Sequence, residues 1–177
     1  MPEATIPFST DYPLYRYIIN PLADRICFIH PNIITFVGLL LVAPIAWTMW
    51  TASPLWIVGA WVLTRHFIDC LDGAVARRCE LKSEWGAIFD IVCDTFYMIV
   101  IAGIICYRAL TAADINLKTV IIINAMIIWS YSMICICYEK LYGIKRQPTF
   151  VELIGHDNGV ITALILVFIY GWAYEKI

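Results

Sequence analysis

The sequence predicts an all-α fold: a polytopic membrane bundle of five to six transmembrane helices with an N-terminal interfacial amphipathic helix. Of the 177 residues, 62% are hydrophobic and only 15% are charged, which excludes an ordinary soluble domain. Long apolar stretches separated by short polar segments recur along the chain, as membrane-spanning helices require. The length suits a single domain over residues 1–177, with a juxtamembrane segment at 1–30 and a transmembrane bundle at 31–177.

The N-terminal segment is predicted to lie on the membrane surface. Met1 to Thr10 lacks a basic start and a continuous apolar core, so we expect no cleavable signal peptide. Tyr12 to Ile29 interleaves Tyr, Leu and Ile with charged residues such as Arg16, which predicts an amphipathic helix along the interface. A short soluble tail is the alternative.

Five stretches are apolar and long enough to cross a membrane. They are Ile33 to Trp50, Pro54 to beyond Ile68, Trp85 to Tyr107, Val120 to Tyr138 and Gly159 to Tyr174. The first follows Pro31, which suits the first turn of a helix. For a sixth helix the only candidate is Tyr142 to Ile154, as a short re-entrant segment, and we favour a bundle that lacks it.

The basic residues predict the orientation of the bundle. If the N-terminus is cytoplasmic, nine of the 12 Lys and Arg residues fall on the inner side, which obeys the positive-inside rule. This places the segment that follows the second stretch at the cytoplasmic interface.

The seven cysteines are expected to be small buried hydrophobic residues in a reducing setting. They show no paired CxxC spacing, so a zinc site is not expected. His66 and His156 have no visible partner in the sequence and are interpreted as structural.

Four aspartates, Asp69, Asp72, Asp90 and Asp94, follow the second apolar stretch. On a helix of about 100° per residue, Asp69 shares a stripe with Asp72, and Asp90 shares one with Asp94. The polar loop Arg77 to Glu84 lets the chain turn back, so the two stripes can face each other. A single aspartate at a helix end is usually a cap or a solvated charge, whereas a carboxylate inside a membrane span costs roughly 2.5–3.5 kcal/mol on insertion scales. Four inward-facing carboxylates therefore indicate bound divalent cations beside a phosphate-bearing ligand.

The same stretch carries a family signature. It reads Asp69-x-x-Asp72-Gly73-x-x-Ala76-Arg77, then eight residues, then Gly86-x-x-x-Asp90-x-x-x-Asp94. This pattern resembles that of the CDP-alcohol phosphatidyltransferases, with every fixed position present. The resemblance implies an integral membrane transferase of phospholipid biosynthesis, which moves a phosphatidyl group from CDP-diacylglycerol to an alcohol acceptor (a polyol, polyol phosphate or amino alcohol) and releases CMP. It also implies a homodimer, and no nucleic-acid partner is expected.

The resemblance implies specific roles for the aspartates. Asp69, Asp72 and Asp90 would hold two Mg²⁺ or Mn²⁺ ions, hard cations that prefer oxygen ligands. Asp94 would help to bind one ion and would act as the general base on the acceptor hydroxyl.

The nucleotide is expected to lie over the small residues of the signature. The residues expected to bind it are Asp69, Gly73, Ala76, Arg77 and Gly86. Asn32 and Thr35 share one helical face before the first span, and family members often carry a similar Pro-Asn-x-x-Thr segment. These two residues are expected either to touch the nucleotide or only to cap and pack.

Basic residues are candidates for binding the acceptor. Arg65 lies one turn before Asp69, so it can neutralise a carboxylate or hold a phosphate. Lys140, Lys145 and Arg146 form a basic segment that would suit a phosphorylated acceptor, and a solvated cytoplasmic loop is the alternative.

Other functions remain open at this point. The run Phe89-Asp90-Ile-Val-Cys93-Asp94 looks somewhat like that of the choline and ethanolamine phosphotransferases, which use a CDP-amino alcohol and diacylglycerol. A non-enzymatic membrane scaffold or a cation transporter could also bury carboxylates between helices. A transporter would more often place its charges near the bilayer midplane, within repeated halves.

Overall fold

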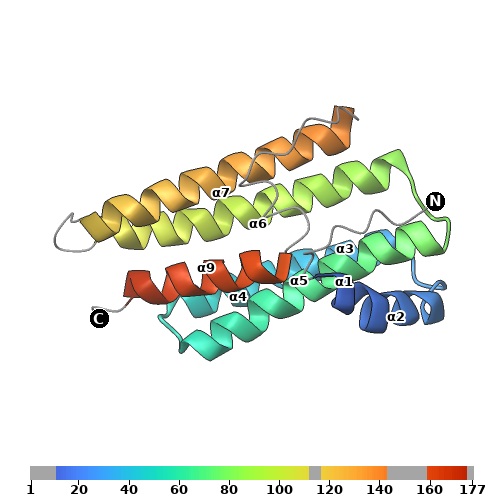
Figure 1. Ribbon diagram of the computed structural model, residues 1–177, viewed down its shortest axis with the longest axis horizontal. Coiled ribbons are helices and arrows are strands. Elements are labelled where there is room, and N and C mark those ends of the chain that lie inside the picture. The colour runs from blue at the N-terminus through green and yellow to red at the C-terminus, as the bar shows by residue number, and fades with distance from the viewer. Residues whose placement is uncertain (1–10, 112–116, 143–158, 175–177) are drawn as a thin grey trace.

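The computed structural model describes residues 11–111, 117–142 and 159–174, and every regular element within these ranges is helical. The elements are α1 (Asp11–Leu14), η1 (Tyr15–Ile19), α2 (Asn20–Arg25), α3 (Pro31–Leu40), α4 (Val42–Trp50), α5 (Leu55–Arg78), α6 (Glu84–Thr111), α7 (Leu117–Tyr142) and α9 (Gly159–Tyr174). The all-α prediction is confirmed. The long helices run side by side along the longest axis of the molecule, and α6 and α7 form an antiparallel pair (Figure 1).

The predicted spans correspond to α3 with α4, α5, α6, α7 and α9. Among the described residues, two helical segments are long and apolar enough to cross a membrane: Pro31–Trp50, with a mean hydropathy of 2.0, and Glu84–Thr111, with 2.1. The other three helices are shorter in their apolar part or, in α5, interrupted by the charges of the signature. The candidate re-entrant segment lies almost entirely outside the described residues.

The first span is one apolar segment built from two helices. Pro31 occupies the first turn of α3, and the imidazole of His30 caps that turn by accepting from the backbone N–H of Asn32 at 3.2 Å. The break at Leu41 follows from Pro44, which has no N–H to donate to the carbonyl one turn earlier. Sequence periodicity alone predicts no such break.

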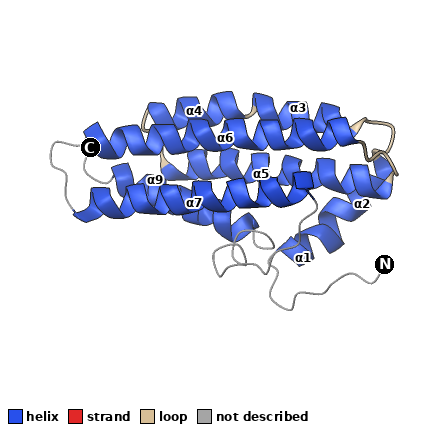
Figure 2. Ribbon diagram, turned by 90° about the horizontal axis from the view of Figure 1, so that it is seen from above, coloured by secondary structure: helices blue, strands red, loops and turns tan. Residues whose placement is uncertain are grey.

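The packing separates a large apolar core from a smaller one. The large core joins α4, α5, α6, α7 and α9 through side chains such as Met49, Val58 and Ile101, which are fully buried. The smaller core lies between α2, α3 and the C-terminal half of α5, around Ile19 and Val75. α3, α4, α5 and α6 occupy adjacent positions in the second view (Figure 2).

The outer faces of the bundle carry large apolar side chains. Trp47 and Phe168 are each 69% exposed, and Ile99 and Ile127 are each 60% exposed. A soluble surface rarely exposes so many large apolar groups, whereas a lipid-facing surface is expected to do so. The exposed side chains therefore agree with a membrane environment.

The N-terminal amphipathic helix is observed as α1, η1 and α2, and it ends at Arg25 instead of Ile29. Pro21 cannot donate to the carbonyl one turn before it, so the preceding turn widens into η1, where Asn20 N–H bonds to the carbonyl of Tyr15. Ile19 is fully buried against α5, and Tyr17 is 70% exposed. The membrane contact of this exposed face stays a prediction.

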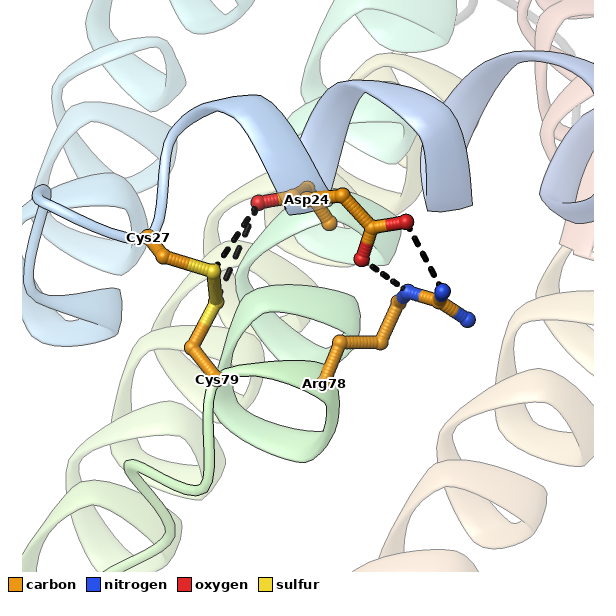
Figure 3. The surroundings of a disulfide bond; sticks show 5 residues. Asp24, Cys27, Arg78 and Cys79 are labelled. Carbon is orange, nitrogen blue, oxygen red and sulfur yellow. Dashed lines mark hydrogen bonds and ion pairs between the residues drawn. A yellow bond between two sulfur atoms is a disulfide. The ribbon is translucent and has the colours of Figure 1, made fainter.

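The end of α2 is tied covalently to the end of α5. Cys27 and Cys79 form a disulfide with a Cα–Cα distance of 5.5 Å, and beside it Asp24 accepts two hydrogen bonds from the guanidinium of Arg78 (Figure 3). The expectation that every cysteine is a reduced, buried thiol is wrong for this pair. Because 52 residues separate the two cysteines, their proximity arises from the packing of α2 on α5 and leaves no local pattern.

The signature turn between α5 and α6 is tight. The N–H of Leu81 bonds to the carbonyl of Ala76 at 3.1 Å, and Glu80 has a φ of 58°. This is the Schellman ending of a helix, in which the residue after the cap adopts the left-handed conformation. α6 then begins at Glu84, so the two halves of the signature lie on consecutive helices that run in opposite directions (Figure 1).

Candidate metal and nucleotide site

A cavity of about 630 Å³ lies between α3, α5 and α6, beside η1. Its volume falls in the range of about 300–1,000 Å³ that is typical of small-molecule sites. The four aspartates of the signature line this cavity, and so do the small residues Gly73, Ala76 and Gly86. The two halves of the signature therefore meet at one place.

Three of the aspartates converge. Asp69 of α5 and Asp90 and Asp94 of α6 each offer a carboxylate oxygen, and these oxygens lie within 4.8 Å of one another. Asp90 and Asp94 are one turn apart on α6, and all three are partly exposed to the cavity. We call Asp69, Asp90 and Asp94 the acidic trio.

Arg65 compensates part of the negative charge of the trio. Its guanidinium donates to Asp69 Oδ1 at 2.9 Å and to Asp94 Oδ1 at 2.5 Å, and it lies 4.6 Å from the ring centre of Tyr97. Arg65 is 8% exposed, so the two ion pairs operate where water screens them little. The sequence predicts that Arg65 either neutralises a carboxylate or holds a phosphate, and the structure contains its contacts with the carboxylates.

Asp72 occupies a separate position in the same cavity. It is 5% exposed and accepts a hydrogen bond from Thr35 Oγ1 at 2.7 Å. It is absent from the group of carboxylates that lie within 4.8 Å of one another. Thr35 thus connects α3 to the signature helix through the carboxylate of Asp72.

Gly86 allows α6 to begin close to α3. A Cβ at this position would lie 2.9 Å from Ser83 Oγ, which is too close for a real contact, and 3.0 Å from Asn32 Oδ1, which would have to shift. The N–H of Gly86 donates to Ser83 Oγ at 3.0 Å, which caps the start of α6. Asn32 therefore lies against Gly86 at the cavity wall, where the sequence predicts the nucleotide.

Arg77 folds back along α5. A Cβ at Gly73 would lie 3.1 Å from Arg77 Nη1, so the missing side chain makes room for the guanidinium. The guanidinium lies 5.7 Å from the ring centre of Tyr15 in η1. Burial, and then the neighbouring Cys70, raise the pKa of Tyr15 above its ordinary value, so its hydroxyl stays protonated and can donate.

The other basic candidates are not placed. Lys140 lies in the last turn of α7, but its side chain is outside the described residues, as are Lys145 and Arg146 altogether. His156 is likewise outside the described ranges. Their role in binding an acceptor stays a prediction.

The cavity wall includes residues that the sequence reasoning missed, among them Asp11, Tyr15 and Cys70. His66, which was expected to have no partner, contacts two of them: its Nε2 lies 3.8 Å from Asp11 Oδ1 and 3.5 Å from Cys70 Sγ. The spacing of His66 and Cys70, one helical turn apart, was a usable local signal. Asp11 offered none, because it lies far away in the chain.

The donor set of the acidic trio suits Mg²⁺ or Mn²⁺. Hard divalent cations prefer carboxylate oxygens, and three of these converge here beside the buried carboxylate of Asp72. Gly73 and Gly86 line the same cavity as these carboxylates. The residues present therefore fit the metal ions that the signature implies.

Comparison with known proteins identifies the family. The model of the CDP-alcohol phosphatidyltransferase family matches residues 28–169. The phosphatidylinositol phosphate synthase of Cutibacterium acnes is 33% identical over 82 residues, which are 45% of this chain and 39% of that protein. The archaetidylinositol phosphate synthase of Methanothermobacter thermautotrophicus is 40% identical over 83 residues, 46% of this chain and 41% of that protein.

A third relative, an uncharacterized protein of Aquifex aeolicus, is 34% identical over 86 residues, 48% of this chain and 43% of that protein. The chain thus spans less than half the length of each of these relatives. No solved structure matches the chain. Because the family model covers most of the chain and the signature residues meet in one cavity, the protein belongs to the CDP-alcohol phosphatidyltransferases, a family of integral membrane enzymes.

Proposed function

We propose that this protein transfers a phosphatidyl-type group from a CDP-linked lipid, with CDP-diacylglycerol as the expected donor, to an alcohol acceptor and releases CMP. The observation that carries the proposal is the convergence of the acidic trio within 4.8 Å in a cavity that also holds Gly73, Gly86 and the buried Asp72. The cavity is flanked by helices with lipid-facing side chains, which suits a donor whose acyl chains stay in the bilayer.

The reaction is a displacement at the lipid-bearing phosphorus. The acceptor oxygen forms a bond to that phosphorus, the bond to the bridging oxygen breaks, and CMP leaves with the bridging oxygen. Asp94 takes the hydroxyl proton of the acceptor, and Arg65 holds Asp94 Oδ1 in place through its 2.5 Å ion pair. The acidic trio and Asp72 would hold Mg²⁺ or Mn²⁺ ions, which would supply positive charge for the pyrophosphate and the departing CMP.

The other residues of the cavity position the donor. We expect the cytidine and the pyrophosphate to lie beside Gly73, Ala76 and Gly86, which line the cavity. We expect Arg77 to bind a phosphate and Asn32 to contact the nucleotide, and both residues line the cavity. The positive-inside count favours a cytoplasmic orientation for this end of the bundle, where soluble CMP is released and a soluble alcohol arrives.

The acceptor that we propose is a phosphorylated polyol of the inositol phosphate class. Two relatives are named as synthases of inositol phosphate lipids, and their matched segments are 33% and 40% identical to this chain. A polyol phosphate also suits the basic segment with Lys140, Lys145 and Arg146. An amino alcohol acceptor carries no phosphate group that these basic side chains could bind.

Release of CMP by the purified protein tests the proposal. The protein, in detergent or lipid nanodiscs, is incubated with CDP-diacylglycerol and one candidate acceptor at a time: inositol phosphate, glycerol phosphate, free inositol or serine. CMP release should depend on the acceptor, stop with EDTA and return with Mg²⁺ or Mn²⁺. Release that is indifferent to chelation would contradict the metal assignment, and no release with any acceptor would contradict the transferase.

A further inference from the structure

A second group of metal-ligating side chains lines the same cavity. The group consists of Asp11 at the start of α1 and of His66 and Cys70 on α5, one turn before and within the signature. Each residue offers one ligand atom, and the three atoms lie within 4.8 Å of one another. Asp11 is 8% exposed and Cys70 is 5% exposed, so both are shielded from bulk water.

The two distances from His66 to the other ligand atoms match the edges of a tetrahedral metal site. His66 Nε2 lies 3.5 Å from Cys70 Sγ and 3.8 Å from Asp11 Oδ1. Ligand atoms that bind Zn²⁺ at about 2.0–2.3 Å with tetrahedral angles are separated by roughly 3.3–3.8 Å. The helical turn between His66 and Cys70 places their side chains on one face, so both can reach one ion.

The donor chemistry differs from that of the acidic trio. An imidazole nitrogen, a thiol sulfur and one carboxylate oxygen favour Zn²⁺ and similar transition metals over Mg²⁺ or Ca²⁺. We propose that Asp11, His66 and Cys70 form a binding site for a transition metal ion of the Zn²⁺ class, with three protein ligands and a fourth position facing the cavity. Binding releases the thiol proton of Cys70, because the thiolate is the ligand.

The surroundings give such an ion a defined structural effect. Asp11 Oδ1 also accepts from the backbone N–H of Val160 at 3.1 Å, at the start of α9. Tyr15 lines the same cavity as Cys70, and the guanidinium of Arg77 lies 5.7 Å from the ring centre of Tyr15. An ion at this site would therefore hold α1 to α5 beside the start of α9, in the same cavity as Arg77.

Cobalt substitution tests the site independently of transfer activity. The full chain is purified with a tag that contains no histidine, without reductant so that Cys27 and Cys79 stay paired, and is stripped of metal. Co²⁺ is then added to the wild type, where we expect a thiolate-to-cobalt charge-transfer band and its loss on addition of Zn²⁺. A wild-type spectrum without that band overturns the proposal.

Variants assign the ligands. Cys70→Ser and His66→Gln should lose the band and the single bound Zn²⁺ measured by mass spectrometry, whereas Cys106→Ser, a matched change outside the cavity, should keep both. Retention of the band and of Zn²⁺ by Cys70→Ser overturns the assignment. If these variants fail to fold, alkylation of Cys70 in the wild type is mapped by peptide mass spectrometry with and without Zn²⁺. We expect Zn²⁺ to protect Cys70, and an unprotected Cys70 overturns the proposal. CMP release in Mg²⁺ is measured separately, so the two proposals fail independently.

Discussion

The cavity brings together two groups of ligating side chains that arise in different ways. The acidic trio combines two residues one turn apart on α6 with one residue of α5, and a turn of five residues joins the two helices. The group of Asp11, His66 and Cys70 forms only when the N-terminal arm, which consists of α1, η1 and α2, packs on α5. The Cys27–Cys79 disulfide and the Asp24–Arg78 ion pair hold this arm in place. The trio is thus a product of local sequence, whereas the second group is a product of long-range packing.

The difference teaches where each group is vulnerable. Substitution of an aspartate of the trio should affect the trio and leave the second group intact. Loss of the disulfide or of the ion pair between α2 and α5 should affect the second group and leave the trio intact. The four predictions that follow test this separation in order of decreasing expected effect.

The largest effect is expected from Asp94→Asn. The amide can still accept a hydrogen bond from Arg65, so the fold should persist, but it cannot take a proton from the acceptor. We expect CMP release to fall by about 10²–10⁴-fold, the usual contribution of a general base. Asp24→Asn, outside the cavity, is the matched control and should keep full activity; turnover by Asp94→Asn close to the wild-type rate would remove Asp94 from the mechanism.

The convergence of the acidic trio could be predicted from the sequence. The helical stripes of Asp69, Asp90 and Asp94 and the turn between them depend on spacing alone, so their convergence could be predicted. The all-α bundle followed from hydropathy in the same way. The hydrogen bond of Asp72 to Thr35 could not be predicted, since it depends on how α3 packs against α5.

The N-terminal arm was less predictable for a physical reason. Its contacts join residues far apart in the chain, such as Cys27 with Cys79 and Asp11 with His66, and no periodic pattern encodes them. From the sequence, all seven cysteines were expected to be small buried residues in a reducing setting. The positive-inside count predicts that this end of the bundle faces the cytoplasm, which is reducing, whereas the structure contains a disulfide there. The oxidation state of Cys27 and Cys79 is therefore a direct test of the predicted orientation.

Loss of the disulfide should give the second largest effect, on stability. Because 52 residues separate the two cysteines, the chain-entropy relation gives about 4 kcal/mol for the double variant Cys27→Ser/Cys79→Ser, at the upper end of measured cases. Thermal unfolding in detergent measures the loss, with Cys106→Ser as control. Transfer activity of the folded variant should persist, since the trio does not depend on the arm.

Alkylation of the protein before and after reduction checks the bond itself. Cys27 and Cys79 should react only after reduction, as seen by peptide mass spectrometry. Free Cys27 and Cys79 in protein that was never reduced would show that packing and the Asp24–Arg78 pair alone hold the arm.

A smaller effect is expected from Thr35→Val, which is nearly isosteric. It removes the donor to Asp72 and leaves a buried carboxylate with one hydrogen bond fewer, at a cost of about 1–3 kcal/mol. Thermal stability should fall, and more Mg²⁺ should be needed for half-maximal CMP release because Asp72 is less well oriented. Thr35→Ser keeps the hydroxyl and should behave like the wild type, and equal loss in both variants would point to packing instead of the hydrogen bond.

The smallest effect is expected from the Asp24–Arg78 pair, which is exposed to solvent. The hydrogen bonds from Arg78 hold the pKa of Asp24 below its ordinary value. A carboxylate whose folded-state pKa is lowered stabilises the fold above its unfolded pKa of about 3.9, and that contribution is lost as the pH falls through the folded pKa. Stability should therefore show no change from this pair between neutral and mildly acidic pH, and should decline only in strong acid.

Asp24→Asn isolates this contribution. At neutral pH and low salt the variant should unfold at a slightly lower temperature than the wild type, and added salt should narrow the gap because exposed charges are screened. The gap should also close in strong acid, where Asp24 of the wild type is protonated and resembles the variant. A gap that persists at low pH and high salt would mean that the Asp24 side chain secures the arm by packing, with its charge playing no part.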